Sequence, residues 1–170
     1  MFIPLVCAAA AYGSGKADIR VNLGHTSIIT DADMSPDGSL LATTGGDGML
    51  RIWDCASFRE IRSAAAPEGW PRVVRFSPDG GRIAWSAENV IRVRSSSEDG
   101  SETALKGHAA MVKDIAFSPD GKMLVSGDKE GVLLVWNLTD GKVLKRISFD
   151  KKEIFDLEFS ADGTALAAEY

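Results

Sequence analysis

One four-residue string recurs along the chain at nearly constant spacing. Ser-Pro-Asp-Gly begins at Ser35, Ser77 and Ser118, and the variant Ser-Ala-Asp-Gly begins at Ser160, so the intervals are 42, 41 and 42 residues. A period of this length is typical of chains built from small supersecondary units, each of which buries its apolar face only against its neighbours. The repeat therefore predicts a series of similar units rather than one continuous core.

Each unit has the pattern of four short strands joined by tight turns. In the first unit the expected strands are residues 28–34, 40–44, 49–53 and 59–63. Ser-Pro-Asp-Gly suits a type I turn that closes a hairpin, because proline presets φ at the second position and glycine accepts the positive φ that follows. No run of about 10 to 12 residues has apolar positions at helical spacing, so helices are expected to be few or absent.

Sheets this small cannot bury their apolar faces alone, so neighbouring units must pack against one another around an axis. We therefore expect an all-β fold, a partial β-propeller of four-stranded antiparallel blades with about four blades present. The expected divisions are partial blade strands in 1–23, repeats in 24–66, 67–106 and 107–149, and a truncated repeat in 150–170.

Two dipeptides recur in register with the turns. Gly24-His25 and Gly107-His108 precede first strands, and Trp53-Asp54 and Trp136-Asn137 end third strands, with 28 residues from His to Trp in both units. On these residues the chain resembles the WD-repeat β-propeller family over residues 24–170. The resemblance implies that a His, a Ser or Thr, an Asp and a Trp of each unit form a buried hydrogen-bonded set. The residues in these positions are His25, Thr43, Asp47 and Trp53 in the first unit, and His108, Ser126, Glu130 (where Asp is usual) and Trp136 in the third.

The repeat at 67–106 departs from this pattern, because Pro67 and Arg94 stand in the His and Trp positions. We expect apolar packing alone to hold that blade. The sequence also begins and ends within the blade pattern, whereas a seven-bladed ring needs about 290 residues at this period. We therefore expect a fragment of a longer polypeptide. The alternatives are assembly with other copies, through self-association of open blade edges, and a small four-bladed ring closed by the N-terminal strands.

The sequence lacks the residue patterns that catalysis and cofactor binding require. Both histidines lie in Gly-His pairs, no serine lies in a nucleophile elbow, and Gly13–Lys16 reads GSGK but is followed by Ala17 where a phosphate-binding loop needs Ser or Thr. Cys7 and Cys55 lie outside any metal-binding spacing. A net charge of −5 without a basic cluster argues against nucleic acid or membrane partners. We expect no enzymatic activity, no cofactor and no metal.

The expected function is a non-catalytic, cytoplasmic scaffold for protein–protein interaction, because loops on a rigid framework carry recognition. Aspartates recur in the first strands, and we expect Asp31, Asp114 and Asp156 to order the loop backbone; the alternative is that they face the central channel or the upper rim. The alternative functions are a regulatory or sensor segment of a longer multidomain signalling enzyme, a propeller of periplasmic type, and a hydrolase built on a propeller. Candidate partner-contact residues lie near the starts of first strands and do not recur: Ile28, Thr30, Met111, Lys113, Lys152 and Phe155.

Overall fold

The described residues form strands and turns and contain no helix. The computed structural model describes residues 6–7, 20–21, 24–97, 101–150 and 152–170. The all-β prediction is confirmed, and three complete antiparallel sheets have the four-stranded order of propeller blades. Within these residues there is accordingly no helix that could cross a membrane.

The three complete sheets lie within residues 24–66, 67–106 and 107–149. The first contains β3 (Ile29–Met34), β4 (Leu40–Gly45), β5 (Met49–Asp54) and β6 (Arg59–Ala65). The second contains β7 (Pro71–Phe76), β8 (Arg82–Ala87), β9 (Val90–Ser95) and β10 (Glu102–Lys106). The third contains β11 (Val112–Phe117), β12 (Met123–Asp128), β13 (Val132–Asn137) and β14 (Val143–Ser148). We call these sheets blades 1, 2 and 3.

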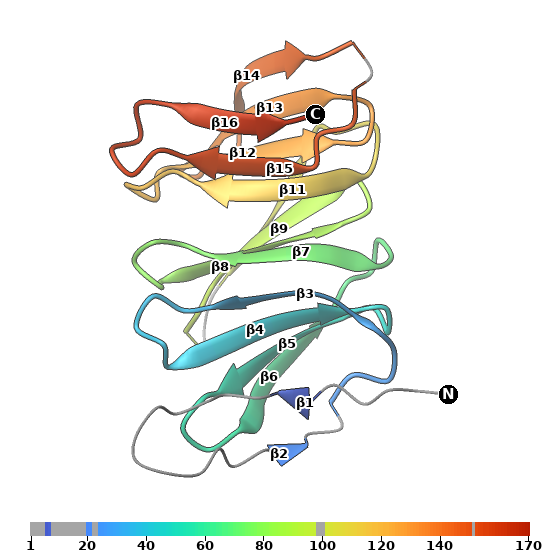
Figure 1. Cartoon of the computed structure of the whole chain (residues 1–170), viewed down its shortest axis with the longest axis vertical. Coiled ribbons are helices and arrows are strands. Elements are labelled where there is room, and N and C mark those ends of the chain that lie inside the picture. The colour runs from blue at the N-terminus through green and yellow to red at the C-terminus, as the bar shows by residue number, and fades with distance from the viewer. Residues whose placement is uncertain (1–5, 8–19, 22–23, 98–100, 151) are drawn as a thin grey trace.

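Two further sheets have two strands each. β15 (Asp156–Phe159) and β16 (Leu166–Glu169) form a two-stranded sheet that follows blade 3, and we call it blade 4. β1 (Val6–Cys7) pairs with β2 (Arg20–Val21). The strands expected in 1–23 otherwise lie outside the described residues. The first strands β3, β7, β11 and β15 are neighbours in that order along the long axis of the molecule (Figure 1).

The Ser-Pro-Asp-Gly turns form as expected. In the first turn the Gly38 N–H donates to the Ser35 carbonyl at 2.8 Å, and Gly38 has φ +71°. The Asp37 carboxylate accepts hydrogen bonds from the hydroxyl of Ser35 and the N–H of Ser39, and these bonds lower the pKa of Asp37 to about 2. The aspartates of the other three turns accept the same kinds of bond. Their periodic recurrence is therefore turn chemistry.

The apolar core lies between blades rather than inside any one of them. One cluster joins Leu50 and Ile52 of blade 1 to Val74 and Trp85 of blade 2. A second cluster joins blades 2 and 3, and a third joins blades 3 and 4. Each blade therefore depends on its neighbours for burial, as stacked repeats do.

Candidate functional site

The predicted set of blade 1 is joined by hydrogen bonds. The Trp53 indole N–H donates to Thr43 Oγ1 at 2.8 Å, and His25 Nε2 lies 2.8 Å from the same oxygen. The other ring nitrogen of His25 lies 2.8 Å from Asp47 Oδ1. Because the carboxylate only accepts, the ring donates from Nδ1, and the Thr43 hydroxyl donates to Nε2. The four side chains form one chain of donors and acceptors with a structural role.

Blade 3 contains an equivalent set with one different member. The Trp136 indole N–H donates to Ser126 Oγ at 2.8 Å, and His108 Nε2 lies 2.6 Å from that oxygen. His108 Nδ1 lies 2.8 Å from Asp128 Oδ2. Burial lowers the pKa of His108, which favours the neutral ring. The prediction of Glu130 as the acid was wrong, because this side chain is exposed and its backbone N–H donates to Asp128.

There is a geometric reason why Asp128, and not Glu130, is the acid of the set in blade 3. Gly45 of blade 1 and Asp128 each lie ten residues after the turn serine, and a Cβ at Gly45 would lie 2.4 Å from His25 Nδ1. A side chain at this position points toward the histidine in both blades. Blade 1 leaves it empty with glycine and supplies Asp47 from the following turn. Blade 3 places the carboxylate there directly.

Blade 2 fills the corresponding space with an indole. Trp85 lies eight residues after its turn serine, where the other two blades have the hydroxyl of their sets, and it is fully buried. The prediction that apolar packing alone holds this blade was wrong. Arg92 also forms ion pairs with Glu68 and Glu102, and hydrogen bonding to Glu68 raises the pKa of Arg92. A charged network that joins β9 and β10 to the turn before β7 therefore adds to the packing of Trp85.

Carboxylates on β3 connect blade 1 to blade 2. Asp31 Oδ2 accepts the Val74 N–H at 3.0 Å, and Asp33 Oδ2 accepts the Phe76 N–H at 2.6 Å. Since β7 is an edge strand of its sheet, these N–H groups have no neighbouring strand to bind. The two aspartates supply the missing acceptors.

Arg75 extends this contact across three blades. Its guanidinium donates to Asp31 of blade 1 at 2.5 Å and to Asp114 of blade 3 at 3.0 Å. Asp114 in turn accepts the Leu157 N–H of blade 4 at 2.8 Å. Burial outweighs the attraction of Arg75 and raises the pKa of Asp114 to about 6. The prediction that these aspartates order the loop backbone was wrong for Asp31 and Asp114, which accept N–H groups from the first strand of a neighbouring blade.

A different group of side chains forms an exposed rim at the opposite end of the first strands from the turns. Ile28, Trp70 and Met111 each lie seven residues before a turn serine. Ile28 is 72% exposed and Trp70 is 59% exposed, whereas Met111 is half-buried. Phe155, near the start of β15, is 55% exposed. We call Ile28, Trp70, Met111 and Phe155 the apolar rim. Trp70 is absent from the residues predicted from the sequence, although it lies seven residues before a turn serine, as Ile28 and Met111 do.

The remaining predicted contact residues have internal partners. The Thr30 hydroxyl donates to the Pro71 carbonyl at 2.7 Å, so this side chain links blades 1 and 2. Lys113 pairs with Glu153 at 2.6 Å and lies over the Phe155 ring at 5.7 Å. Lys152 lies over the ring of Tyr170 at 4.5 Å. Their contact with a partner protein stays a prediction.

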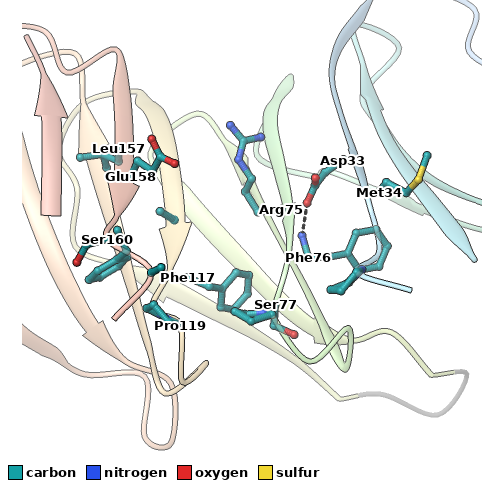
Figure 2. Close-up of a pocket in the computed structure, with 15 residues that line it drawn as sticks. Asp33, Met34, Arg75, Phe76, Ser77, Phe117, Pro119, Leu157, Glu158 and Ser160 are labelled. Atoms are coloured by element: carbon teal, nitrogen blue, oxygen red, sulfur yellow. Dashed lines mark hydrogen bonds between the residues drawn. The ribbon is translucent and has the colours of Figure 1, made fainter. Parts of the chain in front are cut away.

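A groove of about 460 Å³ runs across the turn ends of the four first strands (Figure 2). Its walls are mainly apolar and include Phe76 and Phe117, with Asp33, Arg75 and Glu158 as charged side chains. The hydroxyls of Ser77 and Ser160 in the groove both donate to turn aspartates. No activated nucleophile is formed among these residues, and the described part of the chain holds no group of three metal-ligating side chains.

The family comparison matches the two blades that contain complete hydrogen-bonded sets. The model described as "WD domain, G-beta repeat" matches residues 18–54 and 99–137. The chain belongs to the WD-repeat family. The matched segments of this WD-repeat chain exclude most of blade 2, where Trp85 replaces the hydroxyl of the set.

Curated relatives agree with this assignment. The chain is 28% identical over 144 residues to an uncharacterised WD repeat-containing protein of Synechocystis, covering 83% of this chain and 41% of the relative. It is 27% identical over 175 residues to the small ribosomal subunit protein RACK1y of Oryza sativa, covering 73% and 52%. It is 29% identical over 151 residues to a guanine nucleotide-binding protein subunit beta of Schizosaccharomyces pombe, covering 83% and 49%. The WD-repeat chain therefore spans about half the length of these relatives.

Proposed function

We propose that this WD-repeat chain is a non-catalytic scaffold that binds a partner protein through the apolar rim. The observation that carries the proposal is the 59% exposure of Trp70 in register with the exposed Ile28. Tryptophan is enriched among the few residues that dominate binding energy at protein interfaces. An exposed tryptophan beside further apolar side chains suits such an interface.

The rigidity of the blades supports the same function. The Thr30 hydroxyl donates to the carbonyl of Pro71, the residue after Trp70, so the start of β7 is linked to blade 1. The chain is therefore held in place next to Trp70 before a partner binds, which lowers the entropic cost of association. Rim side chains can present a preformed surface to the partner.

The use of both histidines also supports a scaffold rather than an enzyme. Each ring nitrogen of His25 and His108 lies within hydrogen-bond distance of a side chain in its own blade. A histidine held in this way is unavailable for proton transfer to a substrate. A cytoplasmic location, and a place within a longer signalling protein, are further proposals that rest on the sequence.

The test places a photo-crosslinking amino acid at position 70 of the chain in its native cells. The control places it at Leu144, which is 57% exposed on the outer strand β14, away from the rim. We expect a discrete crosslinked partner at position 70 and none at position 144. Trp70→Ala should weaken binding of that partner about 30-fold or more while the melting temperature stays unchanged. Equal crosslinking at the two positions, or none at position 70, would refute the proposal.

A further inference from the structure

The first strands of blades 1, 2 and 3 share an irregularity near their rim end. The strand register shifts between Ile29 and Asp31 in blade 1, and it shifts at the equivalent places in β7 and β11. A bulge of this kind takes one side chain out of the alternation of the strand and redirects it. The residues five before the turn serines fall within these shifts: Thr30, Arg72 and Lys113.

In blades 1 and 3 the side chain at the bulge is bound to the next blade. The Thr30 hydroxyl donates to the Pro71 carbonyl at the start of β7, 2.7 Å away. The Lys113 ammonium group pairs with the Glu153 carboxylate at 2.6 Å. Glu153 lies seven residues before a turn serine, which is the rim position of its blade. The bulge therefore places a side chain where it binds a group at the rim end of the following blade.

Arg72, at the bulge of blade 2, has no such partner. The residue of blade 3 at the position of Glu153 is Met111, whose side chain supplies no carboxylate. Arg72 makes no hydrogen bond or ion pair with any residue that the structure describes, and its Nε is buried. The guanidinium stays charged at neutral pH. An uncompensated positive charge with a buried donor therefore lies two residues from Trp70.

Neither neighbouring blade supplies the missing carboxylate. β7 lies between β3 and β11, and both of these strands belong to complete four-stranded sheets (Figure 1). The acidic residues of the adjacent turns have other positions, because Glu68 pairs with Arg92, and the Glu88 side chain lies against Gly69. Arg72 is only half-buried, so part of its side chain remains accessible to a group from outside the chain.

We propose that the partner segment bound at the apolar rim carries a glutamate or aspartate next to an apolar residue, and that its carboxylate pairs with Arg72. This inference rests on the proposed function and names the chemistry of the partner. Trp70 and Arg72 are two residues apart, a distance of about 7 Å along a strand, so neighbouring side chains of one peptide can contact both. The apolar side chain packs on the rim, and the carboxylate accepts paired N–H donors of the guanidinium.

The charge of Arg72 selects this partner over other apolar segments. A carboxylate forms charge-assisted hydrogen bonds with a guanidinium that otherwise has a buried donor without an acceptor. An uncharged segment leaves that donor unsatisfied, and a basic segment brings like charges together. The rim therefore favours an acidic and apolar sequence.

The test uses the complete chain as bait for a phage-displayed library of random peptides. Phage that also bind the Trp70→Ala chain are removed, so the retained peptides depend on the rim. We expect the retained sequences to be enriched, relative to the library, in glutamate or aspartate next to an aliphatic or aromatic residue.

One retained peptide is then synthesised with its acidic residue and with the matching amide, and calorimetry measures the binding of both. Arg72→Gln should weaken the acidic peptide at least about tenfold and leave the amide peptide within about twofold. Arg72→Lys should keep part of the affinity, because lysine retains the charge but lacks the paired donors. Lys122→Gln is the control, since it removes an equal charge from a side chain that is 79% exposed at the turn end of blade 3. Melting curves establish that each variant is folded.

Four outcomes would overturn the inference. Rim-dependent peptides without an enriched acid would do so while the proposed function stands, because Trp70 would still be required. Equal weakening by Arg72→Gln and Lys122→Gln would show only general attraction between opposite charges. Self-association of the chain that Arg72→Gln abolishes would make a second copy the occupant. A library that yields no rim-dependent peptide would also overturn it, whereas crosslinking at position 70 still decides the proposed function.

Discussion

Replacing Ser126 with alanine removes a single oxygen atom from the centre of the buried set in blade 3. Ser126 Oγ accepts the Trp136 indole N–H at 2.8 Å and lies 2.6 Å from His108 Nε2. Because His108 Nδ1 donates to the carboxylate of Asp128, Nε2 of the neutral ring is an acceptor, and the serine hydroxyl donates to it. The substitution therefore leaves one buried donor and one buried acceptor without partners.

The expected cost follows from these two groups. Trp136 and His108 are 1% and 4% exposed, so water does not readily replace the lost oxygen. Each buried polar group left unsatisfied costs about 1 to 3 kcal/mol, which gives about 2 to 6 kcal/mol for Ser126→Ala. Ser86 supplies a matched control, because it is equally buried but its hydroxyl makes no hydrogen bond with any described residue. Ser86→Ala should change stability by about 1 kcal/mol or less, in the stabilising direction.

Urea unfolding followed by tryptophan fluorescence measures both values. If the two variants keep the denaturant dependence of the wild type, the shift in midpoint reports the change in the free energy of unfolding. If Ser126→Ala lowers the free energy of unfolding by no more than Ser86→Ala changes it, the reasoning is refuted. The hydrogen-bonded set would then contribute nothing beyond the burial of its members.

The remaining predictions concern the carboxylates of Asp128, Asp114 and Asp33. Asp128→Asn should cost about 1 to 3 kcal/mol in a thermal melt, whereas Glu130→Gln should stay within about 0.5 kcal/mol of the wild type. Asp114 has its pKa raised to about 6, so the folded state keeps a proton that the unfolded state releases at lower pH. The free energy of unfolding should therefore fall by about 3 kcal/mol from this group as pH rises from about 4 to above 6, and Asp114→Asn should remove that slope from a pH series of urea midpoints. In hydrogen exchange, the backbone N–H of Phe76, which donates to Asp33 at 2.6 Å, should exchange more slowly than that of Phe117, because blade 2 has Arg75, which cannot accept a hydrogen bond, at the position of Asp33.

The sequence was sufficient to predict the strands, because their signals are local. Proline, aspartate and glycine specify each turn within four residues, and the apolar runs on either side of it become β3 and β4, or β11 and β12. The positions of His25 and Trp53 followed from the same spacing once the family resemblance was clear. These predictions need no knowledge of which blade lies beside which.

Contacts that depend on side-chain direction were harder to predict. The histidine and its acid are 22 residues apart in blade 1 and 20 apart in blade 3, because side chains ten and twelve residues after the turn serine can both reach the ring. Alignment by the turn serine selected Glu130, which occupies the second of these positions. A glycine at the first position, as at Gly45, would have been the signal that the second is used. Blade 3 has Asp128 there instead.

Equivalent positions of the repeat do not make the same contacts in every blade. Asp31 and Asp114 lie at equivalent positions, and each accepts a backbone N–H from the first strand of the next blade. Between them, blade 2 has Val73 at that position and therefore offers no acceptor to blade 3. Arg75 compensates by donating in both directions, to Asp31 on one side and Asp114 on the other. The junctions between blades are thus held by different chemistry, because edge N–H groups donate to carboxylates between blades 1 and 2 and between blades 3 and 4, whereas an ion pair between Arg75 and Asp114 joins blades 2 and 3.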